Sequence, residues 1–336
     1  PLGLVGTLEG IYSKTLNNIV YQNINRTQPT TTLGGGPDNR EIYPGTFISP
    51  RYTDVILGYN TNEGYTYSLT AQLQKPFTNG WVGSLAYTYG NTRTINDGTS
   101  SQNSSNWVFN ESVNGQNTLP LSFSDFDLGS RVIAFVSKTI RYGTKMGGAT
   151  TFSVFYTGES GQRFSYTYAG NLVRNSNNNG QDLIYIPAQQ SDINLIDDNV
   201  LGTAAAQWTA LNEFIEGDEY LKANRGSYAE RNGRRTPFTN IFDVKVMQEF
   251  NIEMGGRKRG VQVSLDIFNF GNMLKADWGR RFFVSNDNYN LINYRGMANG
   301  NPTYTFRKPT NTVWNIDESG IISSIWQAQL GLRLNF

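Results

Sequence analysis

Apolar and polar residues alternate along much of the chain. The final segment, 326–336, carries apolar side chains at every second position from Trp326 to Phe336, with polar residues or glycine between them. The same period recurs in five other segments: 4–12, 65–74, 81–89, 242–250 and 261–267. Successive side chains of a strand point to opposite faces, so each segment is predicted to be a strand with one apolar face.

The pattern predicts an all-β fold of about eight antiparallel strands, with the whole chain, residues 1–336, in one unit. Two of these strands are less regular, because apolar residues fall on both of their faces near Ile133 and Phe135 and in the strand that follows. The predicted strands cover residues 4–24, 54–77, 81–93, 127–142, 148–168, 237–252, 258–270 and 323–336.

The predicted connections alternate between short turns and long loops. The turns are centred near residues 79, 145 and 255, whereas the loops cover 25–53, 94–126, 169–236 and 271–322. Structureless loops of this length are unusual in a compact domain. Short turns on one side and long loops on the other are typical of outer-membrane barrels. The loops are then expected outside the cell and the C-terminus in the periplasm.

The dimensions and the charges agree with a membrane barrel. A strand over 326–336 is roughly 33 Å long and, tilted by about 45°, rises roughly 24 Å, close to the ~25 Å apolar band of such barrels. Aromatic residues are expected at the two girdles: Tyr12, Tyr65, Tyr67, Trp81, Tyr87, Tyr89, Trp326 and Phe336. The opposite face carries charges suited to a wet lumen: Glu9, Asp243, Lys245, Glu249, Asp266 and Arg333. A soluble β-sandwich remains the rival interpretation.

Composition narrows the class further. Mean hydropathy is −0.45, and no run reaches the roughly 18 apolar residues of a membrane helix, which excludes a helical membrane protein. The chain has no Cys and no His, so disulfides and His-dependent catalysis are absent, and we expect no enzyme activity. A net charge of +1 gives no indication of nucleic-acid binding.

The long loops hold the candidate ligand contacts. A helix is expected over 203–222 inside the longest loop, 169–236, with Trp208 on its apolar side. Aromatic loop residues can either stack on a substrate or anchor the loops, and spacing does not decide between these roles. The expected extracellular contacts with substrate are Trp107, Tyr185, Trp208, Tyr228, Arg231, Arg235 and Trp278.

Two polar clusters have alternative interpretations. Four arginines between 225 and 235 could bind an anionic substrate group or lipopolysaccharide phosphate, or could pair with the nearby acidic residues 213–230. The Asn-rich segment 175–182 is weakly similar to a Ca²⁺ loop, but only Asp182 supplies a carboxylate. No cofactor or catalytic residue is expected otherwise.

Several longer segments resemble a known family. They are GYTYSLTAQLQKPFTNGW from residue 64, AYTYGNTRTINDGTSSQNSSNW from residue 86, FYTGESGQRFSYTYAG from residue 155, DLIYIP from residue 182, and the segment 214–250. Together they resemble the C-terminal part of Oar-like TonB-dependent outer-membrane receptors of Bacteroidota, which are related to SusC-type transporters. The resemblance implies a 22-stranded barrel with an N-terminal plug and a TonB box, and energy-coupled import of a glycan, peptide or metal chelate.

The sequence lacks the signal peptide, plug and TonB box that this family has. The expectation is therefore the C-terminal part of a larger barrel that pairs with the remaining strands and with the plug. The alternative is a stand-alone eight-stranded barrel with a structural or adhesive role. Expected partners are outer-membrane lipid and lipopolysaccharide, TonB through the missing part, and the barrel assembly machinery through Phe336. The resemblance to SusC-type transporters adds a surface lipoprotein to these partners.

Overall fold

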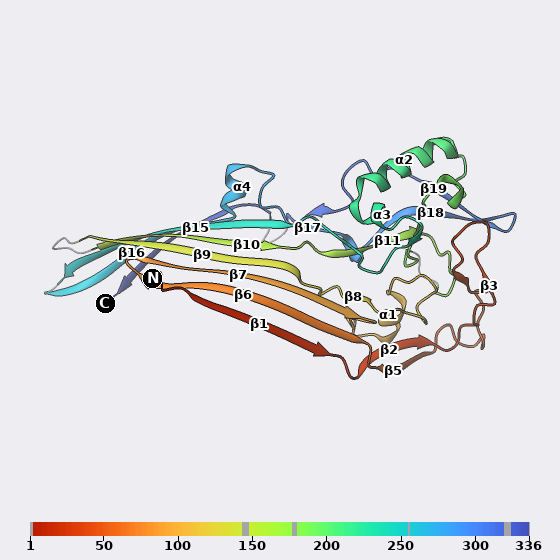
Figure 1. The fold of residues 1–336 in the computed structure, drawn as a ribbon, viewed down its shortest axis with the longest axis horizontal. Helices are drawn as coiled ribbons and strands as arrows, with labels where there is room; N and C mark the ends of the chain where they lie inside the picture. The colour runs from red at the N-terminus through yellow and green to blue at the C-terminus, as the bar shows by residue number, and fades with distance from the viewer. Residues whose placement is uncertain (1–2, 143–147, 177–179, 255, 319–323, 336) are drawn as a thin grey trace.

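A computed structural model describes residues 3–142, 148–176, 180–254, 256–318 and 324–335 of the chain. The predictions for Phe336 lie outside these residues. A long antiparallel sheet extends along most of the molecule, and most of the long connections gather at one end of it (Figure 1). The fold is thus all-β with a few short helices, as the alternation predicts.

The large sheet has nine strands, of which eight form one continuous path with antiparallel neighbours. The ninth, β8 (Ser122–Phe123), pairs only with β7. The path runs, in order, through β1 (Val5–Lys14), β6 (Gly64–Thr78), β7 (Trp81–Thr94), β9 (Gly129–Tyr142), β10 (Gly148–Glu159), β15 (Thr239–Met254), β16 (Arg257–Phe268) and β21 (Gln327–Asn335). Within the described residues, β1 and β21 are the ends of this path and no pairing joins them.

The two faces of the sheet differ in chemistry. Residues opposite each other in an antiparallel pair share a face. Register places Leu330 opposite Leu265 and Leu332 opposite Val263, and the two β21 leucines are 77% and 70% exposed. The other face carries Asp266, whose carboxylate pairs with Lys245 Nζ at 2.8 Å. A sheet with a continuous exposed apolar face needs an apolar environment on that side.

Three predicted strands are divided at two places in the structure. The adjacent segments 4–24 and 54–77 divide into β1 and β2 (Asn18–Asn23) and into β5 (Ile56–Thr61) and β6, and β2 pairs with β5 in a separate sheet. The segment 148–168 divides into β10 and β11 (Arg163–Ala169), which belongs to another sheet. At the second break, a Cβ on Gly161 would meet the Thr236 carbonyl oxygen at 2.2 Å, so the close approach of two backbones redirects the chain.

The long loops are not structureless, which corrects the sequence-based expectation. A four-stranded sheet has the order β14 (Arg234–Arg235), β11, β18 (Asn288–Ala298) and β19 (Asn301–Phe306). The helices α2 (Ala204–Gly217) and α3 (Glu219–Ala223) lie close to it, in the region predicted to be helical (Figure 1).

A hydrophobic core holds these loops together. Its fully buried side chains come from segments far apart in sequence: Phe164, Tyr166, Ile186, Leu211, Ile215, Ile292 and Phe306. The segments 15–63, 95–128, 160–238 and 269–318, in their described residues, are called the loop assembly below.

The remaining elements of the loop assembly are short. They are β3 (Thr31–Thr32), β4 (Glu41–Ile42), α1 (Asn103–Val108), β12 (Tyr185–Ile186), η1 (Gln190–Asp192), β13 (Ser227–Tyr228), α4 (Phe270–Leu274), β17 (Phe282–Phe283), η2 (Ser285–Asp287) and β20 (Asn315–Ile316). Among the helices of the described residues, none has the length and apolar character needed to cross a membrane.

Candidate functional site

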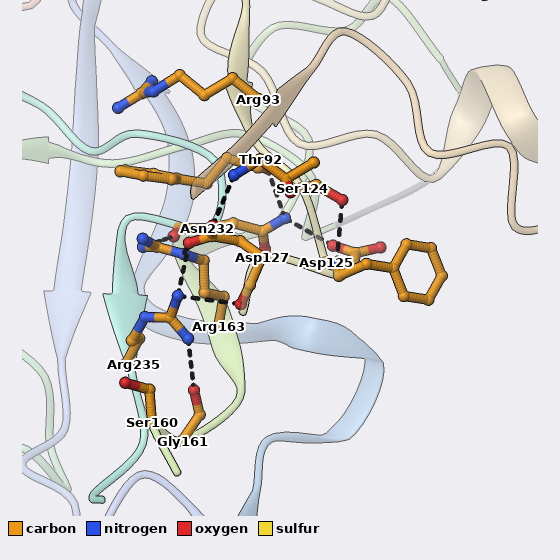
Figure 2. Close-up of polar contacts among 12 residues, drawn as sticks. Thr92, Arg93, Ser124, Asp125, Asp127, Ser160, Gly161, Arg163, Asn232 and Arg235 are labelled. Carbon is orange, nitrogen blue, oxygen red and sulfur yellow. Dashed lines mark hydrogen bonds and ion pairs between the residues drawn. The ribbon is translucent and has the colours of Figure 1, made fainter. Parts of the chain in front are cut away.

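A buried ionic network, the rim network, joins the loop assembly to the end of the large sheet (Figure 2). Its centre is Asp127, whose Oδ2 lies 2.5 Å from Arg163 Nε and 2.5 Å from Arg235 Nη2. The backbone N–H of Thr92 donates to Asp127 Oδ1 at 2.7 Å. The Asp127 side chain is 1% exposed, so strands β7, β11 and β14 are held by one desolvated carboxylate.

A second buried residue, Asn232, extends the rim network. Its side-chain amide nitrogen donates to Asp125 Oδ1 at 2.6 Å and to the Phe123 carbonyl at 3.0 Å, and its backbone carbonyl accepts from Arg163 Nη1 at 2.9 Å. Asn232 has a φ of +58°, a left-handed conformation that asparagine tolerates better than most residues. The network therefore fixes the turn before β14 as well as the strand ends.

The arginine cluster is engaged in internal pairs. Arg225 Nη2 lies 2.9 Å from Glu216, Arg234 Nε lies 2.9 Å from Asp218, and Arg235 pairs with Asp127. Arg231 is 4% exposed and donates to the carbonyls of Thr94 and Ile95. These contacts favour the ion-pair alternative over an open anion site, although the partner of Arg235 lies in a different loop from the predicted acidic residues.

Most of the aromatic candidates are packed rather than open. Trp107 is buried and its Nε1 donates to Asn117 Oδ1 at 2.8 Å. Tyr185 and Tyr228 form an edge-to-face pair with ring centres 5.4 Å apart, and Trp208 packs against the core of the loop assembly. Trp278 differs from these four, since it is 54% exposed.

Asp182 uses its carboxylate within the protein. Its Oδ2 accepts from the backbone N–H groups of Leu172 at 2.6 Å and Val173 at 3.1 Å. Burial raises the pKa of Asp182, against the opposing charge of Arg40. In the parts of the chain that the structure describes, no group of three acidic side chains is arranged to hold a metal ion.

The girdle candidates gather at the ends of the sheet. Tyr12 is opposite Tyr67, which lies 6.4 Å from Tyr65 and 6.3 Å from Tyr89 between ring centres. At the other end, Lys138 lies on the apolar face, with its Nζ 4.8 Å from the Trp81 ring centre. Its Nζ also donates to the Asn79 carbonyl at 2.9 Å. A lysine at this level can place its charge at an interface while its stem stays in apolar surroundings.

Other girdle and lumen candidates are placed by register. Tyr87 bonds Ser130 Oγ at 3.0 Å, and Trp326, just before β21, is 43% exposed. The charged candidates share the face opposite the leucines. Their register partners are Thr70 for Glu9, Phe155 for Asp243, Ser153 for Lys245, Gln262 for Glu249 and for Arg333, and Gln329 for Asp266.

A polar cavity, the acidic pocket, lies beside the rim network. It has a volume of about 460 Å³, within the range of small-molecule sites. Four carboxylates and one guanidinium line it: Asp97, Glu111, Asp125, Asp287 and Arg231. Sequence reasoning missed this site because three of its acids are far apart within the loop 94–126 and the fourth, Asp287, comes from the loop 271–322.

The acidic pocket perturbs its own carboxylates. Burial raises the pKa of Glu111 to about 7 and that of Asp287 to about 6, and the charge of Asp125 adds to both shifts. Burial and the charge of Asp97 raise the pKa of Asp125. All three shifts go in the same direction, with burial as the main cause and the neighbouring carboxylates as a further one.

Taken together, a long antiparallel sheet with one exposed apolar face, one charged face and a large loop assembly at one end defines the wall of a membrane β-barrel. The family described as outer membrane beta barrel domain matches residues 3–278. The chain belongs to this family. Strand β21 lies beyond the matched residues but pairs along its whole length with β16. No curated protein and no solved structure matches the chain significantly.

Proposed function

We propose that the chain is the C-terminal wall of a TonB-dependent importer in the bacterial outer membrane, with the loop assembly outside the cell and the short turns in the periplasm. The observation that carries this is the pair of open edges: within the described residues, β1 and β21 each have one paired side. An open edge facing lipid leaves backbone groups without partners, which a bilayer does not tolerate. Further strands closing the barrel between these edges would widen it enough to admit a solute.

The charged sheet face supports this proposal. A charge facing lipid at mid-depth costs about 2–4 kcal/mol, whereas a water-filled lumen accepts it. The Lys245–Asp266 pair and the hydrogen bond of Gln262 to Glu249 belong to that face. Hydroxyl pairs continue it across neighbouring strands, with Thr70 bonding Thr88 and Ser153 bonding Ser137, both at 2.9 Å. Such a wall suits hydrated solute rather than lipid.

Energy-coupled import by this chain rests on the family resemblance and needs a direct test. The native gene is deleted and restored, and depletion of solutes from a defined medium is followed by mass spectrometry in cells with and without TonB. Import predicts that one group of solutes is depleted only when both the gene and TonB are present. Identical depletion in all strains contradicts transport and favours the stand-alone structural or adhesive alternative, as does a mature protein that folds and functions with only these strands.

Lipid, lipopolysaccharide, the barrel assembly machinery and a surface lipoprotein remain proposed partners. The exposed apolar face, with Leu330 and Leu332, supports contact with lipid acyl chains. The lipoprotein and assembly partners rest on the resemblance alone.

A further inference from the structure

The acidic pocket is the part of the loop assembly least explained by structural needs. The loop core is apolar and Asp127 of the rim network is paired with two arginines, but the pocket gathers four carboxylates around one guanidinium. The formal charge of these five side chains is −3 when all of them are ionised. Among the described residues, no ion pair engages any of these four carboxylates.

Neutral donors satisfy part of each carboxylate instead. Asp97 accepts from Ser124 Oγ at 2.5 Å and from the Asp125 backbone N–H at 3.0 Å. Asn288 donates to Glu111 Oε1 at 3.3 Å, and Gln162 donates to Asp287. Neutral donors hold the acids in position without cancelling their charge, so the site keeps an electrostatic demand for a cation.

Two of the residues that line the same cavity each carry a buried polar atom without a hydrogen-bond partner. Gln181 is 8% exposed and its side-chain Oε1 has no hydrogen-bond partner, and the Nε of Arg231, a residue 4% exposed, has none either. Buried polar atoms in native structures almost always have partners, and an orphaned one is consistent with a missing water, ion or ligand group. An acceptor such as Gln181 Oε1 calls for a donor, which is also what a protonated amine supplies.

The remaining wall of the pocket is suited to an organic ligand. Asn96, Asn106, Asn110 and Asn290 add amide groups, and Phe109, 59% exposed, adds an aromatic ring. A bare metal ion is a poorer fit, because the described residues contain no cluster of three acids arranged around one point. A ligand with several donors spread over a few ångströms matches the separated acceptors better.

We propose that the acidic pocket binds a small organic cation, a solute that presents an ammonium or guanidinium group together with neighbouring hydrogen-bond donors. Its charged group lies among Glu111, Asp125 and Asp287, and a neighbouring N–H donates to Gln181 Oε1. The idea that this cation is the imported substrate rests on the proposed import function. Binding itself is a separate property of the loop assembly.

The raised pKa values of the acids make the binding sensitive to pH. A bound cation favours the ionised carboxylates, so binding releases protons and weakens as pH falls through about 7 for Glu111 and about 6 for Asp287. The charged groups facing these acids are Asp97 and Asp125, which oppose ionisation, and Arg231, which assists it.

The test uses the whole purified protein in detergent and the dipeptide lysyl-lysine, with the dipeptide acetylated on both side-chain amines and on the α-amine as a probe without any ammonium group, in isothermal titration calorimetry. Saturable binding of lysyl-lysine at pH 7.5 is expected, with at least tenfold weaker binding of the acetylated form and at pH 5.5. Glu111→Gln should weaken binding tenfold or more, whereas Glu213→Gln, the same change on the exposed face of α2, should not.

Three outcomes overturn the inference: equal binding of both dipeptides, equal loss in both variants, or no saturable binding of lysyl-lysine at millimolar concentration. If Glu111→Gln fails to fold, the comparison of the two dipeptides and the pH series on the native protein still decide. The solute-depletion experiment separates the two proposals. Binding of lysyl-lysine without import leaves the pocket assigned and contradicts the transporter, whereas import without binding contradicts the pocket alone.

Discussion

Changing Leu332 to Arg tests which face of the large sheet contacts lipid. Leu332 is 70% exposed near the middle of β21, opposite Val263, with Leu330 and Leu334 on the same face. Arginine at mid-depth on a lipid face costs about 2–4 kcal/mol. Since 1.4 kcal/mol is a factor of ten, the inserted population should fall relative to the uninserted one by roughly 30-fold to several hundredfold.

Gln329→Arg is the matched control, because it places the same side chain in the same strand on the opposite face. Gln329 is opposite Asp266, so the new guanidinium meets a carboxylate in the charged face and insertion should be nearly unchanged. The assay compares the folded, heat-modifiable band in outer-membrane fractions and the urea midpoint in lipid vesicles. Equal loss for both variants, or greater loss for Gln329→Arg, would refute the assigned orientation.

Three further predictions concern the loop assembly. Asp127→Asn leaves Arg163 and Arg235 without their carboxylate and should destabilise the assembly by about 3–5 kcal/mol, measured as faster proteolysis of the loops. Asp277→Asn, the control, breaks an exposed pair with Arg280 and should have almost no effect. Leu211→Ala empties a fully buried site in the core and should cost about 2–5 kcal/mol, measured as a lower melting temperature; an unchanged value would mean that the core does not hold the loops. The folded-state pKa of Glu111, about 7, lies above the unfolded value, so its stabilising contribution is complete below about pH 4.5 and is lost as pH rises through 7. Thermal unfolding of the native protein should show a loss of stability of about 3 kcal/mol over this pH range. Glu111→Gln should remove this pH dependence.

The faces of the large sheet were predictable because they depend on local alternation. Each strand of a membrane wall meets lipid on one side and water on the other, so residues such as Leu265 and Asp266 report their surroundings without knowledge of their partners. The same rule failed at 163–168. Phe164, Tyr166 and Tyr168 alternate like a barrel strand, but all three are buried in the loop assembly. Period alone does not reveal which sheet a strand joins.

The loop assembly and its sites depend on long-range contacts that leave little trace in sequence. Strand β11 pairs in parallel with β18, more than a hundred residues later, and Asp127 meets Arg235 across a separation of 108 residues. The acidic pocket combines three acids of the segment 95–128 with Asp287 from the segment 269–318. The arginine cluster was visible as a composition feature, but its partners depend on how the loops pack.

The rim network and the acidic pocket are mechanically linked through one carboxylate. Asp125 lines the pocket and accepts a hydrogen bond from the Asn232 side chain. The backbone carbonyl of Asn232 accepts from Arg163, and the Arg163 guanidinium pairs with Asp127 at the end of the sheet. A cation that attracts Asp125 would therefore act on a chain of hydrogen bonds reaching strands β7 and β9, where Thr92 and Gly129 adjoin the same cluster. Because these links are buried or half-buried, binding in the pocket should slow hydrogen exchange at Thr92 as well as at Asn232. Protection confined to the pocket would show that the two sites are independent.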